Sequence, residues 1–318
     1  MITQTKINEL TEKAKQIKKA LKSNPKNVKL LVNILNSTTN SERQIIRTCY
    51  KRLYNKPIQN DIKEELNNKF KELCISLFDT PYEYDSRELY KSLNSIPIKY
   101  ESIIEIFSSR NKSHLNTINQ AYEQFFKISL KEVFQKKLPL NFSIFLLTIM
   151  DTNREEVKLL SNDDAYEYAK TIKNEDYKIF DNEKTFINIF LKQSREDLIL
   201  ISRAFFELYN INLYKYLKSL KNENIDKNNK KLIKSILFVI INPSEWFCSK
   251  IKKALIGPNI DFNQLNRIII FRSEIDINII RDYYFTDNKK ELCKDIELID
   301  ELKDEDSYRD VLINLCMK

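Results

Sequence analysis

The stretch LVNILNSTTN at residues 31–40 recurs as three similar copies further along the chain. They are IIEIFSSRNK at residues 103–112, FINIFLKQS at residues 186–194 and NRIIIFRSEID at residues 266–276. Each copy begins with apolar residues at helical spacing and ends in small polar or charged residues. A pattern that returns after roughly 70 to 80 residues is typical of a chain built from related structural units. The sequence therefore predicts four related helical units.

The sequence around these copies also predicts helices rather than strands. Two apolar stripes at helical spacing precede and overlap the first copy, namely Ile7, Leu10, Ala14, Ile17 and Leu21, then Leu30, Leu31, Ile34 and Leu35. Alternating apolar and polar residues, the mark of a half-buried strand, are hard to find. Asparagine and proline, as in the turn at residues 23–25, take the place of glycine between helices. We expect an all-α chain of short helices.

Composition excludes most families of enzyme. The chain has 318 residues and a formal charge of +8, with 42% hydrophobic residues, which is typical of a folded, basic protein. Its single glycine, Gly257, and single histidine, His114, leave no Gly-rich phosphate loop and no two-histidine zinc site. A catalytic serine or cysteine would have only His114 as a base. We predict that the protein is not an enzyme and has no catalytic residue.

Cysteine usage and hydropathy predict a cytoplasmic location. The five cysteines are widely spaced and form no C-x-x-C pair, which indicates buried thiols in a reducing compartment. The first residues contain no apolar signal segment, and no apolar run approaches the ~18 residues of a membrane span.

Positive charge is concentrated near the start of the chain. Only Glu9 and Glu12 oppose eight lysines there, which are Lys6, Lys13, Lys15, Lys18, Lys19, Lys22, Lys26 and Lys29. Such a density would attract an anionic lipid surface or a nucleic acid, and the alternative is a solvated helix face. No interleaved aromatic and basic platform supports nucleic-acid binding, so we expect none.

Several segments in a fixed order resemble the annexin family. They are DIKEELNNKFKEL at residues 61–73, YDSREL at residues 84–89 and FRSEIDINII at residues 271–280, together with the four copies described above. The resemblance implies four annexin-like repeats of about five short helices each, forming a curved disk. The predicted repeats are residues 7–80, 81–151, 160–242 and 243–318, with an insertion at residues 221–231 in the divergent third repeat.

The resemblance also implies calcium sites, which this sequence preserves poorly. In the family, backbone carbonyls of a Gly-rich loop and a later carboxylate of the same repeat bind calcium together. The first repeat keeps the carboxylate as Glu65, but its loop KSNPK at residues 22–26 has lost both glycines. Lys137 takes the carboxylate position in the second repeat, and Phe180 takes a glycine position in the third. Glu65 and Gly257, the latter in the fourth repeat, are therefore predicted as degenerate calcium sites, and calcium as not required.

Lysines and apolar loop residues are predicted to replace calcium at the membrane. On the face that the resemblance turns toward lipid lie Lys22, Lys26, Ile96, Ile98, Lys99, Lys136, Lys137, Ile179, Phe180 and Ile260. A basic residue near an anionic leaflet contributes ~1 kcal/mol, less at high salt. The alternative is that these are ordinary loop residues.

A central polar cluster is also implied by the resemblance. Its predicted members are Asp85, Glu88, Glu105, Arg110, Arg267, Arg272 and Asp276. We expect Asp85 to pair with Arg110 and Glu105 with Arg267, because a buried ion without a partner is costly. These pairs would fix how the two halves dock, and the alternative role is ion conduction.

The resemblance as a whole implies a protein peripheral to membranes. We expect an annexin-like protein that binds acidic phospholipid on its convex face, largely without calcium. The alternatives are an annexin-shaped scaffold for protein partners and a residual calcium-dependent membrane binder. Export by a route without a signal peptide stays open.

Overall fold

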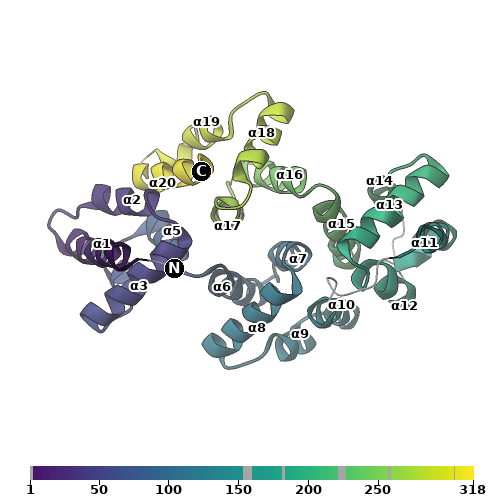
Figure 1. Cartoon of the computed structure of the whole chain (residues 1–318), viewed down its shortest axis with the longest axis horizontal. Coiled ribbons are helices and arrows are strands. Elements are labelled where there is room, and N and C mark those ends of the chain that lie inside the picture. Colours follow the sequence, from purple (N-terminus) through teal and green to yellow (C-terminus); the bar gives the residue numbers. More distant parts are fainter. Residues whose placement is uncertain (1–2, 153–159, 181–182, 221–226, 257–258, 304) are drawn as a thin grey trace. The chain divides into compact units, whose positions relative to one another are not determined.

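The chain is helical throughout the part that can be described. The computed structural model describes residues 3–152, 160–180, 183–220, 227–256, 259–303 and 305–318. Within these ranges it contains twenty α-helices, three short 3-10 or π segments and no strand (Figure 1). The prediction of an all-α chain is confirmed. The chain divides into two compact units, residues 1–84 with 247–318 and residues 85–246.

The first unit combines helices from both ends of the chain. From the N-terminal end come α1 (Gln4–Lys22), α2 (Val28–Asn36), α3 (Asn40–Tyr54), α4 (Ile58–Glu65) and α5 (Asn68–Phe78). From the C-terminal end come α17 (Phe262–Arg272), α18 (Ile277–Asn288), α19 (Leu292–Glu297), η3 (Asp300–Leu302) and α20 (Asp306–Cys316). Helix α20 packs against α2, α5 and α17. The core of this unit is therefore built from both ends of the sequence.

The second unit is one continuous stretch of sequence with one large core. Its helices are α7 (Tyr100–Ser109), α8 (Lys112–Phe126), α9 (Leu130–Lys137), α10 (Leu140–Asp151), α11 (Asn162–Glu175), η1 (Asp176–Phe180), α12 (Glu183–Phe186), η2 (Ile187–Leu191), α13 (Arg195–Tyr209), α14 (Leu213–Ser219) and α15 (Lys227–Ile241). Helices α11 and α13 pack together, as do α7 and α15. The unit boundaries fall within α6 (Pro81–Leu93) and α16 (Pro243–Leu255). No helix in the described parts of either unit is long and apolar enough to cross a membrane.

In helix α1, the apolar residues predicted to lie on one face form the buried face of the helix. Thr3 caps its start, where the side chain accepts a hydrogen bond from the backbone N–H of Lys6 at 3.3 Å. Leu10, Ala14 and Ile17 are fully buried, as the spacing predicted. The lysines are left on the opposite face, where they can reach solvent or α4.

Residues other than glycine end several helices in the left-handed conformation. Asn55 and Asn210 have φ of 51° and 53° and terminate α3 and α13. Lys127 and Lys289, with φ of 58° and 57°, terminate α8 and α18 in the same way. Glycine is the usual residue here, because a Cβ atom disfavours positive φ. Asparagine in this role matches the sequence prediction, but lysine was not predicted.

Candidate functional site

Hydrogen bonds hold the turn between α1 and α2, which contains no glycine. The backbone N–H of Ser23 donates to the carbonyl of Lys19 at 3.0 Å, and Oγ of Ser23 accepts from the backbone N–H of Asn27 at 3.0 Å. The side chain of Asn27 then caps α2 by accepting from the backbone N–H of Leu30 at 3.1 Å. Side-chain hydrogen bonds therefore hold the turn that carries Lys26.

Glu65, the last residue of α4, lies beside this turn with lysine at both carboxylate oxygens. Nζ of Lys22 is 2.5 Å from Oε1, and Nζ of Lys26 is 2.8 Å from Oε2. The hydrogen bonds from Lys22 and then Lys26 lower the pKa of Glu65 to about 2, and the bond to Glu65 raises the pKa of Lys22. Two ammonium groups against one carboxylate leave a surplus positive charge at this turn.

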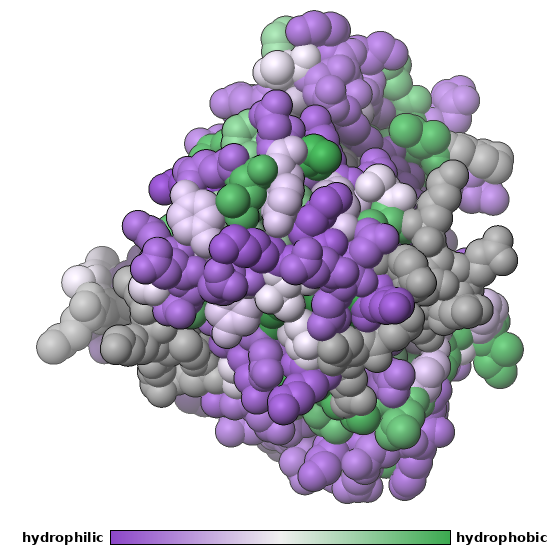
Figure 2. Space-filling view, turned by 90° about the vertical axis from the view of Figure 1, so that its right-hand side faces the viewer, coloured by the Kyte–Doolittle hydropathy of each residue, from purple (hydrophilic) through white to green (hydrophobic). Residues whose placement is uncertain are grey.

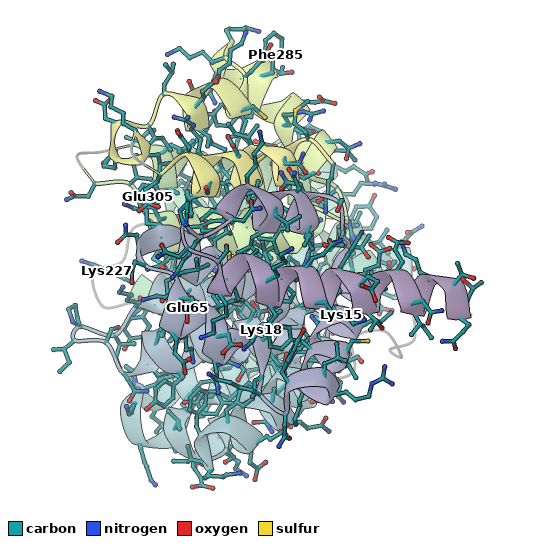
Figure 3. All side chains as sticks on the ribbon, turned by 90° about the vertical axis from the view of Figure 1, so that its left-hand side faces the viewer. Lys15, Lys18, Glu65, Lys227, Phe285 and Glu305 are labelled. Carbon is teal, nitrogen blue, oxygen red and sulfur yellow. The ribbon has the colours of Figure 1, made fainter. Side chains whose placement is uncertain are left out.

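A second carboxylate on α4 is also paired with lysines. Asp61, one helical turn earlier, is buried, and its oxygens contact Nζ of Lys18 at 2.5 Å and Nζ of Lys56 at 2.7 Å. The hydroxyl of Tyr50 also donates to Asp61. Burial acts to raise the pKa of Asp61, but the hydrogen bonds from Lys18, Lys56 and Tyr50 outweigh it and hold the pKa below its usual range. Figure 3 labels Lys18, which lies on α1, and Glu65, which lies at the end of α4.

The residues around Glu65 do not fit a calcium ion. Calcium takes six to eight oxygen ligands at about 2.3 to 2.6 Å, usually with a free or bidentate carboxylate. Here each oxygen of Glu65 already contacts an ammonium group, which would repel the ion. Within the described residues, no group of three or more histidine, cysteine, aspartate or glutamate side chains could hold a metal. Gly257, the other predicted calcium position, lies outside the described residues.

In the second predicted repeat a lysine itself joins the two turns. Nζ of Lys137, at the end of α9, donates to the carbonyl of Leu93 at 3.2 Å and to Oδ1 of Asn94 at 2.5 Å. The ammonium group thus connects the turn after α9 to the turn after α6. Lys136 and Lys99 on the same two turns are exposed. The positive charge that links these two turns is therefore a lysine side chain of the protein itself.

The third predicted repeat differs from the expectation. The exposed position predicted for Ile179 is wrong, because the segment forms the 3-10 helix η1 and places this side chain in the core of the second unit. Asp176 of η1 accepts a hydrogen bond from the hydroxyl of Tyr216 at 2.7 Å. The side chain of Phe180 lies outside the part that the structure describes. Neither of the two apolar residues predicted to contact lipid in this repeat is therefore seen as an exposed side chain in the part that the structure describes.

Other apolar loop positions also need correction. Ile96 is fully exposed, as predicted, but Ile98 is partly buried and packs against the core of the second unit. Ile260 is also only partly exposed. Three strongly exposed residues were not predicted, namely Leu140, Ile256 and Leu298. Each lies next to or two positions from another aliphatic residue, and the sequence does not show which of the two turns inward.

Two pairs within the predicted polar cluster are present in the structure. Nε and Nη2 of Arg110 donate to the two oxygens of Asp85 at 2.7 and 3.1 Å, and both side chains are buried. The predicted Asp85–Arg110 pair is therefore present. In the other unit Arg272 and Asp276 form an ion pair, with Nε of Arg272 at 2.6 Å from Oδ1 of Asp276.

The remaining members of the cluster are buried in their own units. They are Glu88 and Glu105 in the second unit and Arg267 in the first. The pair of Glu105 with Arg267 stays a prediction, as does the role of the cluster.

Several known proteins with similar sequences or structures are annexins. A family model described as Annexin matches residues 12–77 and 84–149. The chain is similar to annexin A3 of Homo sapiens, 29% identical over 273 residues that cover 84% of this chain and 82% of that protein. It is also similar to annexin A6 of Gallus gallus, 26% identical over 310 residues, 95% of this chain but 45% of that protein. The solved structure of annexin III matches with a TM-score of 0.85 at 25% identity, covering 97% of this chain and 94% of that chain.

Proposed function

The chain is an annexin-family protein, and on this premise we propose that it binds acidic phospholipid surfaces mainly without calcium. Annexins in general are calcium-dependent phospholipid-binding proteins and not enzymes. The proposed ligand is the same as in the family, an acidic phospholipid surface, but the positive charge that attracts it comes from lysines instead of calcium. It assigns no catalytic residue.

The contact of Lys22 and Lys26 with Glu65 is the observation that carries this proposal. In a calcium-dependent annexin, the ion would lie at such a carboxylate and attract the anionic headgroup. Two ammonium groups supply positive charge at the same position without a metal. Because the ammonium groups are covalently attached, this charge does not depend on the calcium concentration.

Further lysines support the same reading in the second predicted repeat. Lys99 and Lys136 are exposed beside Lys137, on the turns that Lys137 joins. Each basic residue near an anionic leaflet contributes about 1 kcal/mol, and salt reduces this contribution. Several lysines acting together would hold the protein at the membrane surface, peripheral to the bilayer.

Vesicle co-sedimentation in the presence of a calcium chelator tests the lipid claim. Vesicles containing phosphatidylserine are compared with pure phosphatidylcholine vesicles at low and at high salt. We expect binding to the acidic vesicles only, and weaker binding at high salt. Absence of binding to acidic vesicles at low salt, with or without calcium, would contradict the proposal. It would favour the alternative that the protein is a scaffold of this fold that binds protein partners instead of lipid.

A further inference from the structure

A charged groove lies along helix α3 in the first unit, and its volume is about 800 Å³. One wall is a face of α3 with its C-terminal cap, and consists of Gln44, Arg47, Thr48, Lys51, Arg52 and Asn55. The other wall is formed by Thr80 and Tyr82, at the start of α6. We call this feature the α3 groove. All of its lining residues belong to the first unit.

Arg47 connects the two walls of the α3 groove. Its Nη1 is 2.5 Å from Oε2 of Glu83, and its Nη2 donates to Oε1 of Glu83 at 3.0 Å. Oε2 of Glu83 also accepts a hydrogen bond from the backbone N–H of Thr80 at 2.9 Å. The bond to Glu83 raises the pKa of Arg47. Both oxygens of this carboxylate are therefore used, and it neutralises Arg47 rather than the other cations of the groove.

Two of those cations have no carboxylate partner. The side chains of Lys51 and Arg52 are exposed, and neither forms an ion pair within the residue ranges that the structure describes. Glu42 is the only acidic residue of α3, and it pairs with Lys6. The α3 groove therefore carries a surplus of two positive charges.

The length of the α3 groove suits a short extended peptide. From Gln44 to Asn55 the helix rises about 16 Å, and an extended chain of about five residues spans the same distance. The exposed side chains of Thr48 and Asn55 can form hydrogen bonds with a peptide backbone. The ring of Tyr82 is 37% exposed and can pack against an apolar side chain.

Charge and hydrogen bonds rather than hydrophobicity would select the ligand. On the face of the molecule shown in Figure 2, hydrophobic side chains are scattered among hydrophilic ones. The α3 groove is polar as well, and Tyr82 is the only aromatic residue among those that line it. A single-stranded nucleic acid would need several aromatic side chains for stacking. Basic side chains in a groove are instead a common way of recognising acidic peptide motifs.

The α3 groove is separate from the proposed lipid-binding turn. Asn55 ends α3 close to the start of α4, whereas Glu65 lies with Lys22 and Lys26 at the end of α4. The two ends of α4 are about 12 Å apart. A bilayer surface is also too broad to enter a groove. The anionic ligand that fits the groove is therefore narrower than a membrane.

We propose that the α3 groove binds an acidic peptide segment of a partner protein. The segment lies extended along α3, with one carboxylate at Lys51 and another at Arg52, and an apolar side chain of the segment packs against Tyr82. This site goes beyond the proposed lipid-binding function and does not depend on it. A protein that used both sites would link its partner to a membrane surface.

Fluorescence anisotropy with a labelled peptide tests the site in the absence of vesicles. The probe is a fluorescein-labelled peptide with two glutamates on each side of a phenylalanine, and the matched peptide carries four glutamines instead. We expect binding of the acidic peptide only. The double variant Lys51→Gln/Arg52→Gln should weaken this binding about tenfold at low salt, since one exposed ion pair is worth up to about a factor of five.

The matched control is Lys29→Gln/Lys63→Gln, which removes the same charge from exposed positions on α2 and α4 of the first unit. It should bind the acidic peptide within about twofold of the wild type, because only the net charge changes. Tyr82→Ala should weaken binding about threefold, and should have no effect on a peptide with alanine in place of phenylalanine. All the substituted side chains are exposed, so each variant should unfold at the wild-type temperature.

Chemical acetylation locates the bound peptide independently of affinity. The acidic peptide should protect Lys51 from acetic anhydride, as measured by mass spectrometry. Lys63, which is exposed outside the groove, should react as it does without the peptide.

Four results would overturn the inference. If the double variant binds the acidic peptide as tightly as the wild type and Lys51 is not protected, the peptide binds elsewhere. If inorganic phosphate displaces the peptide at the same concentration, the groove is a site for small anions. If the double variant loses affinity for phosphatidylserine vesicles instead of for the peptide, the groove contacts lipid. If the peptide does not bind but the double variant abolishes self-association in sedimentation, the ligand is a second copy of the chain.

Discussion

Nζ of Lys26 lies 2.8 Å from Oε2 of Glu65, so a lysine contacts the carboxylate at which calcium is expected in this family. The substitution Glu65→Gln removes the negative charge and leaves both lysines. Because residue 65 then no longer cancels part of the charge of these lysines, the affinity of the protein for acidic vesicles in chelator should rise about fivefold. The neighbouring change Glu64→Gln, at an exposed residue paired with Lys56, is the control and should have a much smaller effect. A fall in affinity in chelator would contradict this account, whereas a loss of affinity that Glu65→Gln shows only in the presence of calcium would indicate that Glu65 binds the ion.

Lys137 provides a test in the second predicted repeat. Reversing its charge in Lys137→Glu should weaken binding to phosphatidylserine vesicles roughly thirtyfold at low salt, because two units of charge change near the lipid. Lys131→Glu makes the same change at the exposed first turn of α9. Flotation or co-sedimentation of the two variants compares them directly. Equal effects would show that only the net charge of the protein matters.

The buried carboxylate of Asp61 predicts how stability depends on pH. Its pKa is lowered in the folded state by hydrogen bonds from Lys18, Lys56 and Tyr50, against a value of about 3.9 in an unfolded chain. A lowered pKa stabilises the folded state above the unfolded value, and this contribution is lost as pH falls toward the folded value. Asp61→Asn should therefore lower the free energy of unfolding by about 3 kcal/mol at neutral pH.

The same variant should lose less stability on acidification than the wild type does. Denaturant unfolding at neutral and at acidic pH measures both effects. Asp300→Asn, at an exposed residue, is the control and should match the wild type. If Asp61→Asn loses as much stability on acidification as the wild type does, the acid dependence of stability comes from other carboxylates.

The pair of Asp85 and Arg110 should be coupled in stability. Either Asp85→Asn or Arg110→Met alone leaves a buried polar group without its bidentate partner, and should cost about 3 to 5 kcal/mol. The double variant should cost clearly less than the sum of the two. Thermal or denaturant unfolding of the four proteins in this cycle gives the coupling. Strictly additive losses would show that the two side chains are stabilised by other neighbours.

The sequence predicted the fold well because helix faces depend on local spacing. The stripe of Leu10, Ala14 and Ile17 is buried as predicted, and the Asp85–Arg110 pair is present. The burial of the stripe follows from helical periodicity alone. The pair follows from the positions that the resemblance to annexins implied, together with the cost of a buried charge without a partner.

The loops were predicted less well because exposure there depends on packing between distant segments. Ile98 turns inward and Ile96 outward, although both are isoleucine in one short turn. Ile179 was predicted to be exposed, but η1 buries it. The resemblance to annexins implied that Glu65 takes the carboxylate position. It did not reveal that Lys22 and Lys26 reach both of its oxygens, because side-chain direction depends on the packing of α4 against α1.

The most direct test is the affinity of the wild-type protein for phosphatidylserine vesicles at one low ionic strength, measured in chelator and in saturating calcium. If lysines replace calcium at Glu65, the two affinities should agree within about twofold, and both should fall as salt is raised. Binding that occurs only with calcium would contradict this mechanism and show that the ion displaces Lys22 and Lys26 or binds elsewhere in the chain.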